Sequence, residues 1–204
     1  GGMYFQNEST TFMATGSRTR TTVASNTAGT FGGGVAASLG ADIMVESGAT
    51  FVVENNSATS ESGGGVYLKN EGSAFSVAGS STRVVVESNT ARQNGGGVAA
   101  LLGADVMIET RAALVVQNNT ATSLYGGGVY LQDEGSTFTA TGDSTRVSVE
   151  SNTAGQKGGG MFSTAGADVM VESGAALVVQ SNAAVFEGAG IALASRGTSL
   201  SVVG

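Results

Sequence analysis

The sequence predicts an all-β fold, a parallel β-helix (β-solenoid), from a short tandem repeat, strand-like runs inside each repeat, and no helical pattern. Glycine triplets ending at Gly34, Gly65, Gly97, Gly128 and Gly160 mark repeats of alternately 31 and 32 residues. Each repeat holds three alternating runs rich in β-branched residues, separated by Gly, Ser, Asn and Thr. No window has apolar residues at helical spacing. We therefore expect about six stacked coils with three strands each.

Two kinds of repeat alternate along the chain. The first kind spans Val66 to Ala91 and recurs from Val129 and, more loosely, from Met3. The second spans Val98 to Ala121 and recurs from Val35 and Met161. Because the pair recurs every 63 residues, we predict one β-helix segment over residues 1–204, built from two-coil units. The chain starts and stops in mid-repeat, which predicts part of a longer array or copies that stack end to end.

The alternation within strands predicts which side chains face the core. Residues three and five positions before the repeated Asn are almost all apolar, as at Val86 and Val84. The position two before the Asn is polar in five of the six coils, as at Glu87, and by the same alternation it should face water. Inward residues of the other two strands follow from the same alternation. They are Val66, Leu68, Val129 and Leu131 in the first strand, and Phe75, Val77, Val106 and Ile108 in the second.

The composition excludes several classes of function. The chain has 33 Gly in 204 residues and no Pro, Cys, His or Trp. A Cys/His zinc site, a disulfide scaffold and a Ser-His-Asp triad are therefore impossible. The net charge of −7 disfavours nucleic-acid binding, and no apolar run approaches the ~20 residues of a membrane-spanning helix. We expect no cofactor and no metal ion, although calcium binding by oxygen-rich columns stays an open alternative.

Two residue types recur once per coil and predict structural roles. An Asn amide can donate and accept hydrogen bonds along a stack, so one Asn per coil predicts a hydrogen-bonded ladder at a corner. The ladder comprises Asn26, Asn56, Asn89, Asn119, Asn152 and Asn182. The triplets ending at Gly34, Gly65, Gly97, Gly128 and Gly160 predict a glycine turn where the backbones approach closely.

Two further sets of residues are candidates for contact or modification. Tyr4, Tyr67 and Tyr130 should point outward beside the glycine triplets and could contact a partner, or could only shield the adjacent sheet. Asn7, in a predicted turn, is the best of three glycosylation sequons. We expect the other two, at Asn55 and Asn118, to be held at the strand corner.

Carboxylates also recur in columns, which raises the possibility of catalysis. Asp42, Asp105 and Asp168 share one position, and neighbouring members should lie ~9.6 Å apart, within reach of a two-carboxylate mechanism. Such a site would be a local exception with irregular loops, whereas these residues recur in every second coil. We therefore predict that the protein is not an enzyme.

The Gly-Gly-Gly-Val elements, as at Gly63–Val66 and Gly95–Val98, alternate with Val-x-x-Asn, as at Val86–Asn89. This pairing resembles the repeats of polymorphic outer-membrane autotransporter adhesins and, more broadly, the right-handed parallel β-helix repeat of surface and secreted proteins. Gly stands here where the adhesins have Ala, and Val where they have Phe.

The resemblance implies a right-handed coil and an extracellular or cell-surface location. The expected function is a structural segment of an adhesin or filament. Its expected partners are a further coil of the same or another chain, or a host surface or glycan. The alternative is a carbohydrate-active β-helix enzyme or a sugar-binding module.

Overall fold

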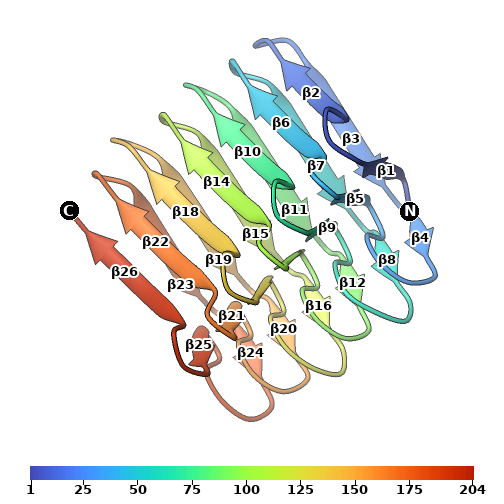
Figure 1. Ribbon diagram of the computed structural model, residues 1–204, viewed down its shortest axis with the longest axis vertical. Coiled ribbons are helices and arrows are strands. Elements are labelled where there is room, and N and C mark those ends of the chain that lie inside the picture. The colour runs from blue at the N-terminus through green and yellow to red at the C-terminus, as the bar shows by residue number, and fades with distance from the viewer.

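The computed structural model describes all of residues 1–204 and consists of 26 β-strands in four parallel sheets, which we name A to D (Figure 1). Sheet A contains β1 (Met3–Gln6), β5 (Val35–Ser38), β9 (Val66–Lys69), β13 (Val98–Leu101), β17 (Val129–Gln132), β21 (Met161–Thr164) and β25 (Ile191–Ala194). Sheet B contains β2 (Thr11–Thr15), β6 (Asp42–Glu46), β10 (Ala74–Ala78), β14 (Asp105–Glu109), β18 (Thr137–Thr141), β22 (Asp168–Glu172) and β26 (Ser199–Val203). The structure contains no helix that is long and apolar enough to cross a membrane.

The other two sheets have six strands each. Sheet C contains β3 (Arg20–Ala24), β7 (Thr50–Glu54), β11 (Arg83–Glu87), β15 (Ala113–Gln117), β19 (Arg146–Glu150) and β23 (Ala176–Gln180). Sheet D contains β4 (Thr27–Ala28), β8 (Ser57–Ala58), β12 (Thr90–Ala91), β16 (Thr120–Ala121), β20 (Thr153–Ala154) and β24 (Ala183–Ala184). Coils 1 to 6 each contribute one strand to every sheet, and β25 and β26 begin a seventh coil.

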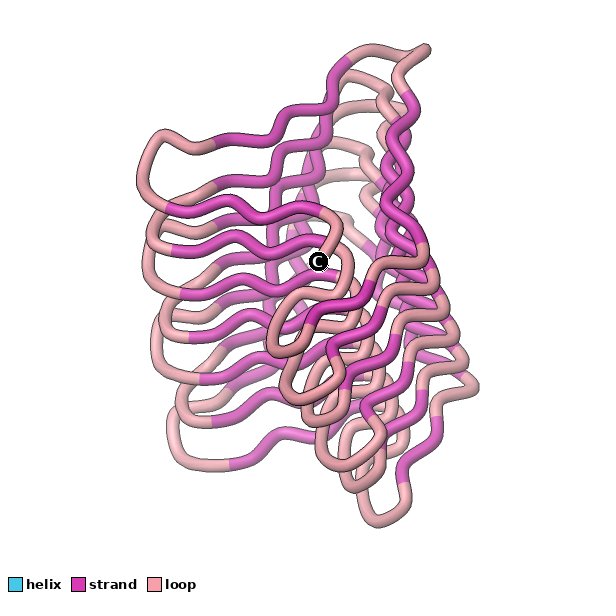
Figure 2. The backbone as a smooth tube through the Cα atoms, turned by 90° about the vertical axis from the view of Figure 1, so that its right-hand side faces the viewer, coloured by secondary structure: helices cyan, strands magenta, loops and turns pink.

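The predicted fold class is confirmed, with one more strand in each coil than expected. The coils stack along one axis, and the loops lie at their corners (Figure 2). Sheet D supplies the additional strand, which is only two residues long, Thr-Ala in most coils. A segment of two residues is too short to show the alternation by which a strand is recognised, so the sequence pattern predicts only three strands per coil.

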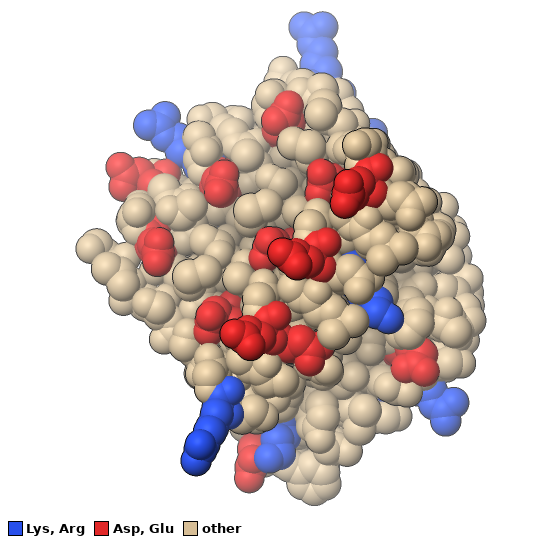
Figure 3. Space-filling model, in the orientation of Figure 1, with Lys and Arg blue, Asp and Glu red and all other residues tan.

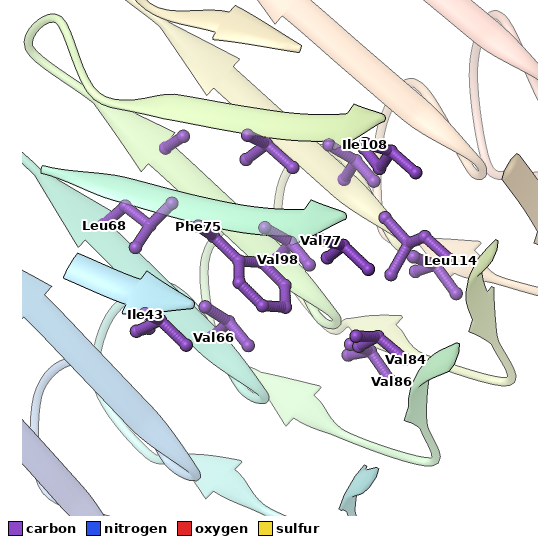
Figure 4. Close-up of a cluster of buried hydrophobic side chains, with 14 of the residues drawn as sticks. Ile43, Val66, Leu68, Phe75, Val77, Val84, Val86, Val98, Ile108 and Leu114 are labelled. Atoms are coloured by element: carbon purple, nitrogen blue, oxygen red, sulfur yellow. The ribbon is translucent and has the colours of Figure 1, made fainter. Parts of the chain in front are cut away.

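The predicted inward columns form the core. Parallel pairing places Val86 between Val53 and Val116, and Val84 between Phe51 and Leu114. All six of these residues belong to a cluster of 33 buried residues that runs through the stack (Figure 4). Glu87, one residue beyond Val86, is partly exposed, as the alternation predicts. Each buried aliphatic side chain stabilises the fold by about 1.5–3 kcal/mol before the entropic cost of ordering the chain.

Candidate functional site

The corner between sheets C and D holds an asparagine ladder that runs through all six coils. In the first five members, Asn26 to Asn152, the backbone N–H and the side-chain Nδ2 both donate to Oδ1 of the Asn in the next coil, at 2.9 and 3.0 Å. Nδ2 of Asn119 also donates to the backbone carbonyl of Val86, at 2.9 Å. The four interior members, Asn56, Asn89, Asn119 and Asn152, are at most 1% exposed.

The glycine triplets pack directly against this ladder, and their members have different roles. The first glycine, for example Gly95 with φ +61°, lies in the left-handed region that other residues avoid. The third glycine has no such φ. A Cβ on Gly97 would lie 2.7 Å from the carbonyl oxygen of Gly128 and 2.9 Å from Nδ2 of Asn119. The third position must therefore be Gly because the next coil and the ladder leave no room for a side chain.

The tyrosine column points away from the main core, but only part of it is exposed. Tyr4 is 63% exposed, whereas Tyr67 and Tyr130 are each 4% exposed. The expectation of an exposed contact column is therefore wrong for Tyr67 and Tyr130. They form a second buried cluster with Ala36, Ala99 and Phe162 on the outer face of sheet A.

Loops between sheets D and A cover this second cluster, and their aromatic residues stack on it. Phe31, just before β5, stacks on Tyr67 of β9 with ring centroids 4.6 Å apart. Tyr125, just before β17, stacks on Phe162 of β21 at 4.5 Å. The loop before β5 thus covers β9, and the loop before β17 covers β21. In both cases the covered strand belongs to the next coil.

Burial of the two tyrosines predicts an alkaline titration. Loss of hydration raises the pKa of Tyr67 from its ordinary value of 10.0 to about 12, and the nearby Glu61 carboxylate adds to the effect. Desolvation likewise raises the pKa of Tyr130 to about 12, with smaller effects from Asp133 and Tyr125. A folded pKa above the unfolded value means that the neutral phenol stabilises the fold below pH 10. That stabilisation is lost as the pH rises through about 12.

We expect phenolate absorbance to show two tyrosines that ionise near pH 12, followed by unfolding. The substitution Tyr67→Phe should remove one of the two late-titrating groups, while Tyr4→Phe, at an exposed site, should leave both. A late phase that Tyr67→Phe does not reduce would contradict the assignment.

One cavity opens on this same face, in the first three coils. It has a volume of about 710 Å³ and lies between the loop Thr27–Phe31 and the outer face of sheet A. Its aromatic lining is Tyr4, Phe31 and Tyr67. Its polar lining includes Gln6, Ser38, Lys69 and Asn70. The Lys69 ammonium lies 5.9 Å from the centroid of the Phe31 ring, a cation–π distance.

The carboxylate columns lie on the outer face of sheet B, at both ends of its strands. Asp105 begins β14, and its Oδ1 accepts a hydrogen bond from Oγ1 of Thr137 at 2.6 Å. Burial raises the pKa of Asp42, partly opposed by a hydrogen bond from the Ala74 backbone N–H. Glu71, Asp105 and Glu134 line a hollow of about 400 Å³. No three carboxylates come close enough together to hold a metal ion.

Asn7 lies exposed in the turn between β1 and β2, with φ +80°. The other two sequon residues differ from expectation. Asn55 and Asn118 are exposed with φ of +55° and +56°. It is the residue after each of them, Asn56 or Asn119, that is held in the ladder.

Ser and Thr hydroxyls at two turns of every second coil form hydrogen bonds that the sequence analysis did not predict. They explain why two kinds of coil alternate. Oγ of Ser136 donates to the carbonyl of Gln132 at 2.7 Å and accepts from the backbone N–H of Gly103 in the preceding coil at 3.0 Å. Ser73 and Thr198 make the same pair of bonds at the same turn. Thr82 and Thr145 do so at the turn between sheets B and C.

Coils of the second kind have Ala at both of these turns, as at Ala104 and Ala112, and every one of these Ala residues is buried except Ala175 in the sixth coil. The two kinds of coil are thus complementary, because the hydroxyl of one satisfies the turn N–H of the other. The signal in the sequence was the alternation of Ala with Ser or Thr at these two positions.

Comparison with known proteins agrees with this geometry. The family model described as a right-handed β-helix region matches residues 2–144 and 38–204, which together cover nearly the whole chain. No curated protein and no solved structure gave a significant match. With its parallel sheets, in-register stacking and family match, the chain belongs to the right-handed β-helix family.

Proposed function

We propose that this chain is a structural segment of an extracellular or cell-surface adhesin or filament, and that it acts as a scaffold without catalysis. The observation that carries the proposal is the unbroken asparagine ladder. The same pair of bonds joins each coil to the next from Asn26 to Asn182. A stack in which every coil repeats the same bonds, with no irregular coil, is typical of a rigid spacer. An active site, by contrast, needs residues that differ from those of neighbouring coils.

The last coils expose apolar residues that a further coil would cover. Leu177, Val179, Ile191, Leu200 and Val202 are exposed or half-buried and belong to an entirely apolar lining at this end of the stack. A coil from the same chain or from another copy would bury these side chains and pair with the strand edges. Stacking of this kind would lengthen a filament without any change in the repeat.

Antibodies against the chain test the location. They should label intact cells of the source organism without permeabilisation. Labelling that requires permeabilisation would contradict a cell-surface role.

Incubation with acidic and neutral polysaccharides tests the absence of catalysis. We expect no turnover by the wild-type chain. Turnover that is abolished by Asp105→Asn and kept by Glu87→Gln, a matched change on sheet C, would overturn the scaffold proposal.

The cavity favours glycan binding as a second candidate function. Aromatic rings beside amide, hydroxyl and ammonium groups suit the apolar faces and hydroxyls of a sugar. Calorimetric titration with oligosaccharides tests this function. Binding should be lost in Phe31→Ala and kept in Tyr125→Ala, which removes the equivalent stack outside the cavity. Absence of binding to a broad set of oligosaccharides, or equal loss in both variants, would exclude the cavity as the site.

A further inference from the structure

The outer face of sheet B carries a row of methionine side chains. The middle residue of each sheet B strand points outward, between two residues that point inward. In four of the seven strands this residue is Met, and these four are most of the six methionines in the chain. We name this row the methionine column. It comprises Met13 of β2, Met44 of β6, Met107 of β14 and Met170 of β22.

Parallel pairing keeps the methionine column in register along the stack. Met13 and Met44 are direct neighbours in adjacent strands, which lie about 4.8 Å apart. From Met44 onward, a residue with a hydroxyl group follows each methionine in the next coil. These residues are Ser76 after Met44, Thr139 after Met107 and Ser201 after Met170.

The methionine column is open to solvent, unlike the other two methionines. Met13 is 53% exposed, and the other three members are half-buried. Met161, by contrast, is 1% exposed and belongs to the main core, and Met3 packs against that core. A small reagent in water can therefore reach the methionine column of the folded chain, whereas it cannot reach Met161.

The equivalent outward positions of the other long sheets hold different residues. In sheet C this position is Val in four of six strands, as the strand preference of β-branched residues predicts. In sheet A it is an aromatic residue or Ala, and aromatic loop residues stack on two of these rings. No Val or Ile stands at this position in sheet B, and no aromatic ring covers it. The use of Met at an uncovered strand position points to the chemistry of the sulfur atom rather than to packing.

Carboxylates flank three of the four methionines along their strands. In β14, for example, Asp105 and Glu109 lie two residues before and two residues after Met107, on the same face. Acidic side chains also gather in the middle of the face drawn in Figure 3. Charged groups on both sides keep this surface hydrated, and they do not repel an uncharged oxidant such as hydrogen peroxide.

A peroxide oxidises an exposed thioether to a sulfoxide. The sulfur supplies the electron pair of a new bond to one peroxide oxygen, and the O–O bond breaks. The proton of the transferred hydroxyl passes to the other oxygen, which leaves as water, so the sulfur is oxidised and the peroxide is reduced. The sulfoxide oxygen accepts hydrogen bonds, and water and the hydroxyls of Ser76 and Thr139 can donate them. Because the methionine column points outward, the reaction places no polar group in the apolar core.

We infer that the methionine column is an oxidation site, at which peroxides convert Met13, Met44, Met107 and Met170 to sulfoxides while the solenoid stays folded. Each of the four sulfurs consumes one equivalent of peroxide, and the surface of sheet B changes from apolar to polar along the column. The fold protects Met161, because a sulfoxide there would lie in the core. This inference does not depend on the proposed scaffold role or on the location of the protein.

Tandem mass spectrometry of the protein over a time course with hydrogen peroxide tests the inference. We expect the four residues of the methionine column to be oxidised at least about tenfold faster than Met161, with Met13 the fastest of the four because it is the most exposed. Circular dichroism and thermal denaturation of the oxidised protein should show an intact β-sheet and a cooperative transition. Column residues that react as slowly as Met161, or loss of the fold on oxidation, would overturn the inference.

Two variants and one denatured sample serve as controls. Replacement of all four column residues by Leu keeps apolar side chains of similar volume, and this variant should consume at least about threefold less peroxide than the wild type. Met161→Leu is the matched control, and it should consume as much as the wild type. In urea, Met161 of the wild type should react as fast as the column residues. Equal consumption by the two variants, or protection of Met161 that persists in urea, would contradict the assignment.

Discussion

Replacement of Asn119 by Leu is expected to lower the free energy of unfolding by about 4 kcal/mol, because it leaves buried polar groups of the ladder without partners. Oδ1 of Asn119 accepts hydrogen bonds from the backbone N–H and from Nδ2 of Asn89, and Nδ2 of Asn119 donates to Oδ1 of Asn152. Leu has a similar volume but can neither donate nor accept. Chemical denaturation followed by circular dichroism measures the loss.

The neighbouring residue provides a matched control. Asn118 precedes Asn119 in the chain, is exposed, and makes no side-chain hydrogen bond. Asn118→Leu must still adopt φ +56°, so the more informative control is Asn118→Asp, since Asp tolerates that conformation. Asn118→Asp should change stability by less than about 0.5 kcal/mol. Equal losses at the two positions would show that the ladder does not stabilise the stack.

Asn119→Asp separates the loss of hydrogen bonds from the loss of shape. The carboxylate keeps both acceptor positions, but it faces the carbonyl oxygen of Val86 and Oδ1 of Asn152, to which Asn119 donates. Burial and these two oxygens should raise the pKa of Asp above its unfolded value. The variant is then closest to the wild type in stability at low pH, and the deficit grows as the pH rises through the folded pKa. A deficit that does not depend on pH would contradict this account.

The parts of the fold that could be predicted are those with a periodic signal in the sequence. Alternation over five residues identifies the inward faces, and it correctly predicts that Val84 and Val86 lie in the core. The repeated Asn and the glycine triplets recur once per coil and therefore had to stack. The two-residue strands of sheet D have no alternation to detect, and they follow directly after the Asn of each coil.

The burial of Tyr67 could not be predicted, because it depends on contacts between distant segments. Alternation placed this side chain outside the main core, which is correct. Whether an outward side chain meets water depends on the loop that covers it, and the covering residue, Phe31, lies 36 positions earlier in the chain. Tyr4 has the same position in its own coil and is exposed, so residue type and strand position alone cannot separate the two.

Gly97→Ala is expected to destabilise the protein by about 3 kcal/mol, because the added methyl group overlaps backbone that cannot move without displacing a whole coil. The new Cβ would lie 2.7 Å from the carbonyl oxygen of Gly128 in the next coil, and 2.9 Å from Nδ2 of Asn119 and from Cγ1 of Val116. Relief of the overlap would separate the two coils where the ladder bonds form. Thermal and chemical denaturation should therefore show a lower midpoint in this variant.

Gly190→Ala is the matched control, because Gly190 holds the third place in Gly188-Ala189-Gly190, the counterpart of a glycine triplet at the end of the stack. Only Cγ1 of Val179 would be near the new Cβ there, at 3.6 Å. At that distance the methyl group makes an ordinary contact. The unfolded chain meanwhile loses freedom, so Gly190→Ala should be neutral or stabilising by up to about 1 kcal/mol. The same substitution thus has opposite signs at two equivalent positions, and the difference depends only on whether another coil lies against the glycine. A loss at Gly190 as large as that at Gly97 would mean that backbone conformation, rather than close packing between coils, requires the third glycine.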